Sequence, residues 1–227
     1  DYNEFDPEHD PNIPYNYNAV TFRKEKVKNK TALQQELGLD VDPKKFMIGI
    51  VSRLTDQKGL DLIQCVMDEL CSEDLQLVVL GTGDEKYENM FRHFAWKYGG
   101  RVSANIYYSE PMSHKIYAAC DAFLMPSLFE PCGLSQLISL RYGTVPIVRE
   151  TGGLRDTVEP YNEYESKGTG FSFANYNAHE MLGMIRYAKH IYYDKKREWN
   201  KIIDRGMARD YSWASSARKY EDLYRWM

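Results

Sequence analysis

The sequence predicts an α/β fold built around a parallel, doubly wound sheet. Short apolar runs alternate along the chain with amphipathic stretches of helix length, as in parallel sheets with crossover helices. The run Phe46–Val51 is apolar at successive positions, as a strand covered on both faces requires, and Leu75–Leu80 is expected to be the next strand. Hydrophobic residues make up 43% of the 227 residues, enough for the core of one large domain or two small ones.

Turn and cap residues divide the chain into elements. The expected strands are 46–51, 75–80, 102–107, 122–125, 145–148 and 171–173, and the expected helices are 28–37, 60–70, 85–98, 113–119, a helix from Pro131 to Tyr142, 177–192, 195–209 and 213–226. Ser113 is expected to cap its helix, and Pro131 suits a first turn. Leu134, Leu137, Ile138 and the ring of Tyr142 have the spacing of one buried helical face. Asn177 with Glu180 forms a capping box.

Three segments are expected. Residues 1–27 contain prolines and little periodicity, which predicts an inter-domain linker with at most one helical turn. Residues 28–209 form the main domain, and 210–227 a C-terminal helix. The polar opening of the chain predicts a fragment of a longer polypeptide.

Composition excludes several classes of function. A net charge of -4 provides no global basic field for nucleic acid. No apolar run approaches the ~18 residues of a membrane span, and no signal peptide opens the chain. The four cysteines include no Cys-x-x-Cys pair, which favours reduced thiols.

Polar groups gather in the loops that follow the strands, where ligands bind to doubly wound sheets. These loops contain Arg53, Lys58, Gly81, Gly83, Tyr108, Glu130, Gly133 and Ser135. Arg53 and Lys58 would neutralise a diphosphate, and the helix start near Ser135 would add N–H donors and the helix dipole. Tyr108 could stack on a base, and Glu130 could bind sugar hydroxyls.

The residues alone leave other interpretations open. Lys58 also suits a solvated helix start, Gly81–Gly83 a tight turn without the third glycine of a dinucleotide motif, and Tyr108 simple packing. Cys132 could be a nucleophile activated by the helix end. Because no histidine lies near it in sequence, a structural or backbone-contact role is preferred. Asp40–Asp42 resembles a metal-binding pair, but it follows a helix rather than a strand.

Several motifs together resemble the bacterial glycogen synthases and plant starch synthases. They are Val51–Leu62, Gly81–Asp84, Tyr108–His114, Pro126–Leu134, Arg141–Thr144, Thr151–Val158 and Gly168–Phe171, in the family's order. The resemblance implies the Rossmann-like, donor-binding C-terminal domain of a GT-B glycosyltransferase. Such enzymes transfer glucose from ADP-glucose to the non-reducing end of an α-1,4-glucan, with retention and without a metal or other cofactor.

The resemblance also implies roles for individual residues. Arg53 and Lys58 match the pair that holds the diphosphate and stabilises the leaving group, and Glu130 matches the acid that contacts the donor glucose. Tyr108 matches the residue that stacks on adenine, and Gly81 lies in the matching glycine turn.

Further matches are less central to the chemistry. Cys132, Gly133 and Leu134 match backbone contacts to sugar and phosphates, Ser135 a phosphate contact, and Lys30 a lysine near the site. The family's second acid falls at Ile138, as is common in the glycogen and starch synthase branch.

The implied partners are ADP-glucose or ADP, an α-1,4-glucan and a missing N-terminal domain, with no nucleic acid and no membrane. The last helix would cross to that missing domain, so Trp213, Tyr220 and Tyr224 should be partly exposed or their helix displaced. The chain alone should bind ADP weakly and have negligible activity. The cytoplasm of a bacterium is favoured over a plastid. The alternatives are a UDP-sugar transferase, a non-catalytic glucan-binding or regulatory domain and, third, a nicotinamide oxidoreductase.

Overall fold

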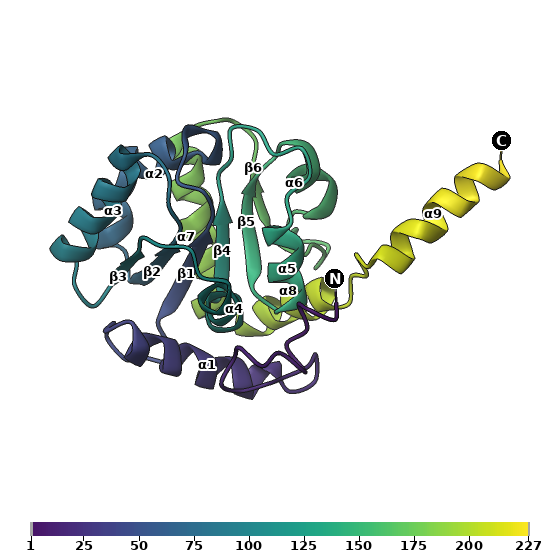
Figure 1. The fold of residues 1–227 in the computed structure, drawn as a ribbon, viewed down its shortest axis with the longest axis horizontal. Coiled ribbons are helices and arrows are strands. Elements are labelled where there is room, and N and C mark those ends of the chain that lie inside the picture. Colours follow the sequence, from purple (N-terminus) through teal and green to yellow (C-terminus); the bar gives the residue numbers. More distant parts are fainter. Residues whose placement is uncertain (1, 227) are drawn as a thin grey trace.

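The computed structural model describes residues 2–226. In this part of the chain, six parallel strands form one sheet in the order β3-β2-β1-β4-β5-β6, with helices on both faces (Figure 1). The strands are β1 Phe46–Val51, β2 Leu75–Leu80, β3 Val102–Asn105, β4 Ala122–Met125, β5 Val145–Arg149 and β6 Phe171–Phe173. The predicted doubly wound α/β fold is confirmed.

The helices are α1 Phe22–Glu36, α2 Leu60–Ser72, α3 Glu85–Lys97, α4 Glu110–Ala119, α5 Ser135–Arg141, α6 Gly152–Thr157, α7 Ala178–Asp194, α8 Lys196–Met207 and α9 Trp213–Arg225, with a short 3₁₀ turn, η1, at Asp56–Lys58. None of those described is long and apolar enough to cross a membrane.

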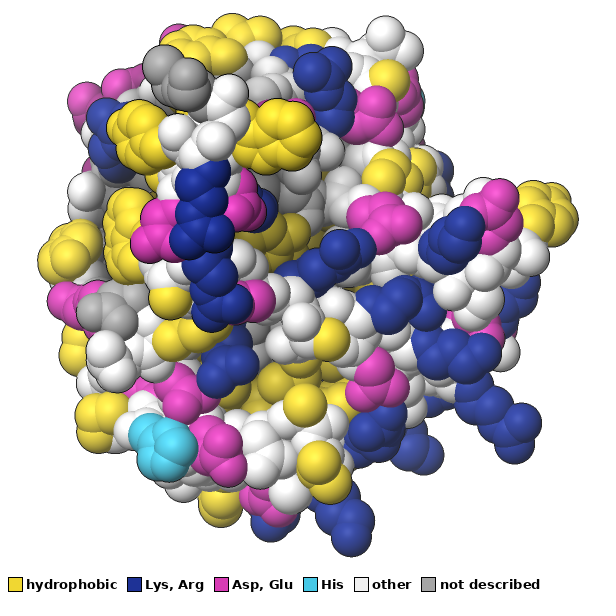
Figure 2. Space-filling view, turned by 90° about the vertical axis from the view of Figure 1, so that its right-hand side faces the viewer, with side chains coloured by type: hydrophobic (Ala, Val, Ile, Leu, Met, Phe, Trp, Pro, Cys, Tyr) yellow, Lys and Arg dark blue, Asp and Glu magenta, His cyan; other side chains and the backbone are white. Residues whose placement is uncertain are grey.

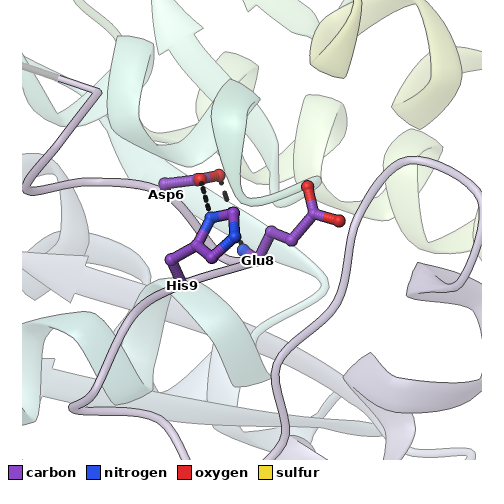
Figure 3. A group of neighbouring side chains, drawn as sticks. All are labelled: Asp6, Glu8 and His9. Atoms are coloured by element: carbon purple, nitrogen blue, oxygen red, sulfur yellow. Dashed lines mark hydrogen bonds and ion pairs between the residues drawn. The ribbon is translucent and has the colours of Figure 1, made fainter.

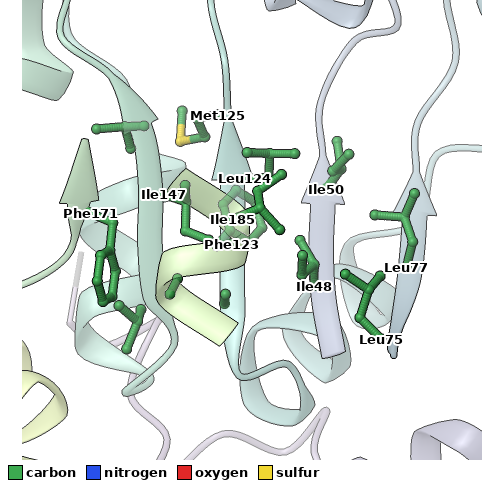
Figure 4. Close-up of a cluster of buried hydrophobic side chains, with 14 of the residues drawn as sticks. Ile48, Ile50, Leu75, Leu77, Phe123, Leu124, Met125, Ile147, Phe171 and Ile185 are labelled. Atoms are coloured by element: carbon green, nitrogen blue, oxygen red, sulfur yellow. The ribbon is translucent and has the colours of Figure 1, made fainter. Parts of the chain in front are cut away.

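Strand alternation divides the core between the two faces of the sheet. Ile48 and Leu77 pack with α2 and α7 in the larger cluster, part of which Figure 4 shows with Ile185 of α7. Met47 and Val78 point the other way and pack with α1 and α4. Burial on both faces explains why β1 and β2 are apolar at nearly every position.

Helices α1 and α4 begin earlier in the chain than predicted. Helix α1 begins at Phe22, before the predicted Lys28, because Phe22 is buried in the core and anchors the first turn. Helix α4 is capped by Ser109, whose hydroxyl accepts a hydrogen bond from the Met112 N–H at 3.2 Å. Ser113 does not cap it, because its hydroxyl donates to the Glu110 carbonyl within the first turn.

The prediction for α5 was wrong in its start and in most of its buried face. The helix begins at Ser135, beyond the predicted Pro131, because the backbone turns at Gly133 with φ 75°. The Gln136 side chain holds this turn by donating to the carbonyls of Cys132 and Gly133, both at 3.0 Å. The face toward the core consists of Gln136, Ser139 and Leu140. Of the predicted face, Tyr142 is buried as expected, whereas Leu134, Leu137 and Ile138 line a surface groove.

Three smaller outcomes concern the other elements. Strand β3 ends at Asn105 rather than at Tyr107, because Asn105 pairs with Leu80, the last residue of β2. Helix α6 was not predicted. Asn177 caps α7 as predicted, by accepting from the N–H groups of His179 and Glu180.

The segment before α1 packs against the domain rather than extending freely. Asp10, Ile13 and Tyr17 are buried, and the Tyr17 hydroxyl donates to the Tyr142 carbonyl at 2.7 Å. At the other end, α9 projects away from the body of the molecule (Figure 1), and no side chain of Trp213–Arg225 is buried.

The exposure of α9 agrees with the sequence-based expectation. Trp213, Tyr220 and Tyr224 are 80%, 63% and 70% exposed. Figure 2 looks onto the side from which α9 projects, and hydrophobic side chains there lie among lysines and arginines.

The tight turn at Gly59 generates a prediction about stability. Gly59 has φ +72°, and a Cβ there would lie 2.0 Å from the Pro126 carbonyl oxygen. Gly38 is a matched control, because its φ of +66° is similar but nothing lies within 4 Å. Gly38→Ala should lower the free energy of unfolding by about 1–2 kcal/mol through backbone strain. Gly59→Ala should cost about 1–3 kcal/mol more, because a backbone must also move. Urea denaturation measures both, and equal losses would contradict the close approach.

Candidate functional site

The site lies where the strand order reverses, between β1 and β4. These neighbouring strands pair in parallel, and their connections run to opposite sides of the sheet, as at a ligand-binding switch point. A cavity of about 150 Å³ opens at their carboxyl ends. Arg53 and Lys58 after β1 and Ser135 at the start of α5 all line it. The structure therefore brings together the three residues predicted to hold one diphosphate.

The loops after β1 and β4 are locked together through their backbones. Gly59 lies against the Pro126 carbonyl with no room for a side chain. Next to this contact, the Leu128 N–H donates to the Gln57 carbonyl at 2.9 Å. The two loops are thus held at a fixed separation, and their longer side chains meet.

That meeting is an ion pair between Lys58 and Glu130. The Lys58 Nζ lies 2.6 Å from Glu130 Oε2, and the two side chains are only 18% and 9% exposed. The Ser127 hydroxyl donates to the same carboxylate oxygen at 3.3 Å. An ammonium has three donors and a carboxylate about four acceptor positions, so both groups keep the capacity to bind a ligand while paired.

Further contacts fix the loop that contains Glu130. Arg149, at the end of β5, donates from Nε to the Ser127 carbonyl at 2.7 Å and from its terminal nitrogen to the Leu128 carbonyl. The Gly153 N–H donates to the Glu130 carbonyl at 3.0 Å. The sequence analysis missed Arg149 and Ser127. Arg149 could have been found, because it stands at the carboxyl end of a strand, where functional residues collect.

A second, larger cavity of about 420 Å³ adjoins the first, and Ser52 and Arg53 line both. Gly81 and Tyr108 line the larger cavity, as the sequence analysis predicted for a nucleotide site. Tyr108 is 86% exposed, so its ring is free to stack on a ligand. Glu4 and Phe5 from the N-terminal segment also line this cavity. No sequence motif pointed to them, because tertiary packing alone brings that segment here.

Cys132 and Leu134 lie at the edge of the site. Both are exposed and line a neighbouring groove of about 470 Å³, together with Ile138 and Trp213. Gly133 forms the turn between them. Their predicted roles as backbone contacts remain predictions, because those roles do not depend on where the side chains point.

Lys30 does not join this site. It forms an ion pair with Asp121 at 2.7 Å, with both side chains nearly buried, and it donates to the Tyr192 hydroxyl at 3.0 Å. Asp121 directly precedes β4, so the pair lies at the amino ends of the strands, opposite the cavities. The predicted nucleotide contact is corrected to a structural one: Lys30 ties α1 to the sheet and to α7.

Within residues 2–226, one group of side chains has metal-ligand spacing, namely Asp6, Glu8 and His9 (Figure 3). Asp6 already pairs with Arg141 at 2.8 Å and with His9 at 2.8 Å, and these contacts hold the pKa of Asp6 below its usual value despite partial burial. This group lies outside the lining of the two cavities.

Comparison with curated proteins identifies bacterial relatives over nearly the whole chain. The chain is 80% identical over 224 residues to the glycogen synthase of Lachnospira eligens, and 55% identical over 224 residues to that of Clostridium acetobutylicum. In both cases the match covers 99% of this chain and 47% of the relative. The chain therefore spans about half the length of these relatives. The predicted resemblance to glycogen and starch synthases is confirmed.

Solved structures of glycosyltransferases also resemble this chain. The catalytic domain of starch synthase IV from Arabidopsis thaliana, bound to ADP and acarbose, matches with a TM-score of 0.91 and 34% identity, over 99% of this chain and 47% of that one. Sucrose-phosphate synthase from Thermosynechococcus elongatus matches with a TM-score of 0.64 and 22% identity, over 88% of this chain and 50% of that one, and shares the fold. The family model described as "Glycosyl transferases group 1" matches residues 30–203. The chain belongs to the glycosyl transferases group 1 family.

Proposed function

We propose that this chain is the donor-binding part of a glycogen or starch synthase, which transfers glucose from ADP-glucose to the non-reducing end of an α-1,4-glucan with retention. The convergence of Arg53, Lys58 and Ser135 on one cavity is the observation that carries this proposal. The names of the relatives support it, as does the ADP and acarbose bound to the starch synthase neighbour.

The proposed chemistry depends on charge at the leaving group. Breaking the bond between glucose and phosphate places negative charge on ADP, and fixed cations lower that barrier most because they need no reorganisation. Arg53 has no ion-pair partner in residues 2–226, so its full charge is available to the phosphates. Lys58 is held in place by Glu130. These two cations supply the positive charge in the proposed reaction, and the resemblance implies that no metal or other cofactor is required.

The proposed reaction must also transfer the acceptor hydroxyl proton and orient the donor glucose. The acceptor 4-hydroxyl attacks the anomeric carbon from the face that ADP leaves, and a phosphate oxygen of the departing ADP takes the hydroxyl proton. Glu130 orients the donor glucose by accepting from its hydroxyls. The carboxylate is suited to this role because its loop is fixed at Ser127 and Leu128 by Arg149.

The rest of the intact polypeptide is proposed to supply the acceptor cleft. In this proposal 28–209 is the donor domain, 1–27 the inter-domain segment, and 210–227 the helix that docks on the other half. The exposed aromatic side chains of α9 support this arrangement. The bacterial relatives support a bacterial protein, for which we propose a cytoplasmic location.

Replacing Lys58 tests the role of the cation. In the intact polypeptide, Lys58→Ala should lower kcat by about 10²–10³-fold, as loss of one preorganised donor does in other active sites. Glucan binding should change little. Lys97→Ala is the control, because Lys97 at the end of α3 forms a surface ion pair with Asp68 of α2. This substitution should leave both quantities unchanged. Steady-state kinetics and a glucan-binding assay measure the two effects. Equal losses in kcat and in glucan binding would contradict the proposed role.

The chain alone gives a second test. It should bind ADP weakly and show negligible transfer from ADP-glucose to glucan, because one side of the acceptor cleft lies in the other half. Calorimetry with ADP and a radiolabelled transfer assay provide the measurements. Rapid glucosyl transfer by these 227 residues would refute the division of labour between the two halves.

A further inference from the structure

The larger cavity contains two carboxylates that the proposed reaction does not use, those of Glu4 and Glu110. Neither forms an ion pair or a side-chain hydrogen bond within residues 2–226. A diphosphate is anionic, so these carboxylates cannot serve it. Within the proposed function, what remains for them to contact is the nucleoside, through its ribose or its base.

Contacts on both sides of Glu4 fix its position. Before it, the Tyr2 hydroxyl accepts from the Tyr211 N–H at 2.8 Å. After it, the Phe5 ring stacks on His114 with centroids 4.7 Å apart, and Asp6 pairs with Arg141 at 2.8 Å. Glu4 is therefore an exposed residue within an anchored segment.

A buried network completes the anchor. Asp10 accepts from Tyr142 Oη at 2.6 Å and lies 2.7 Å from His114 Nδ1, and all three side chains are almost completely buried. These hydrogen bonds hold the pKa of Asp10 below its usual value despite burial. Because His114 belongs to α4, the network fixes the N-terminal segment to the helix whose first turn also lines the cavity.

Glu110 has a structural reason to be acidic, whereas Glu4 has none. Glu110 lies in the first turn of α4, where the helix dipole stabilises an acid. Glu4 lies outside the helices of the described residues, so no helix dipole accounts for its charge. An ionised carboxylate only accepts hydrogen bonds. Adenine presents an exocyclic amino donor, whereas pyrimidines of the thymine and uracil type present a carbonyl acceptor at the corresponding edge.

We propose that Glu4 recognises the exocyclic amino group of the adenine base while Tyr108 stacks on its face, so that the N-terminal segment discriminates between nucleotides. This inference rests on the proposed function, since it assumes that the cavity binds the donor's nucleoside. It assigns to Glu4 a role in selecting adenine over bases that present a carbonyl at that edge.

The experiment compares ADP with inosine diphosphate and UDP by calorimetry on this chain. Inosine diphosphate differs from ADP by a carbonyl in place of the amino group. The unaltered chain should prefer ADP to both. Glu4→Gln should weaken ADP binding by about tenfold, the range for loss of a charged hydrogen bond. It should also bring the affinities for ADP and inosine diphosphate close together, because an amide both donates and accepts.

Glu110→Gln is the matched control, because it removes the same charge from the same cavity. It should shift the affinities for all three nucleotides by similar factors and leave the preference for ADP unchanged. A Glu4→Gln chain that keeps the preference for ADP overturns the inference but leaves the proposed function intact. So does a Glu110→Gln chain that loses this preference. If the unaltered chain binds none of the three nucleotides, the proposed function fails and this inference fails with it.

Discussion

The ion pair between Lys58 and Glu130 is the interaction on which the site depends. It joins the loops after β1 and β4, the two strands between which the sheet reverses its order. Holding two charges at such low exposure incurs a desolvation penalty of several kcal/mol per ion, and their attraction offsets it only with good geometry and additional hydrogen bonds. Ser127 supplies one such bond. Replacing such a pair with well-packed hydrophobic residues is often neutral or stabilising for a fold, so the pair alone is weak evidence for stability, and in the proposed function its charges serve the ligand.

Glycine makes that geometry possible. A Cβ at Gly59 would lie 2.0 Å from the Pro126 carbonyl, and one at Gly153 would lie 1.9 Å from the Cys132 carbonyl. At both points backbone lies directly on backbone, so no side chain separates the loops. Lys58 and Ser127, which lie on these loops, line the smaller cavity. The glycines let the loops approach closely, and this approach allows the long side chains of Lys58 and Glu130 to pair.

How far the sequence predicts this structure depends on whether local or distant contacts decide each feature. Because β1 and β2 are buried on both faces, their apolar runs can be recognised in the sequence. Functional residues of such sheets lie after the carboxyl ends of the strands, and this places Arg53, Lys58 and Glu130 at one edge of the sheet. The start of α5 was missed because the turn at Gly133 depends on the Gln136 side chain. The course of the N-terminal segment was missed for a similar reason, since Asp10 is held by residues far along the chain. Lys30 was misplaced because a motif match does not reveal at which end of the sheet a residue lies.

The site places the Glu130 carboxylate next to its cations, and this arrangement of charges affects which ligand it can bind. Among the described residues Arg53 has no ion-pair partner, whereas Lys58 shares its charge with Glu130. A nucleoside diphosphate with no hexose on its terminal phosphate would attract both cations but would compete with Glu130 for Lys58. The buried Glu130 carboxylate would then lose part of the positive charge that offsets its own. A diphosphate linked to a sugar meets both demands, because its phosphates approach the cations while its hydroxyls donate to the carboxylate. In the proposed reaction that balance changes when the glucosyl bond breaks: the phosphates gain charge and draw more strongly on Lys58, while Glu130 remains with the sugar that is transferred. The same ion pair would thus favour separation of the two products.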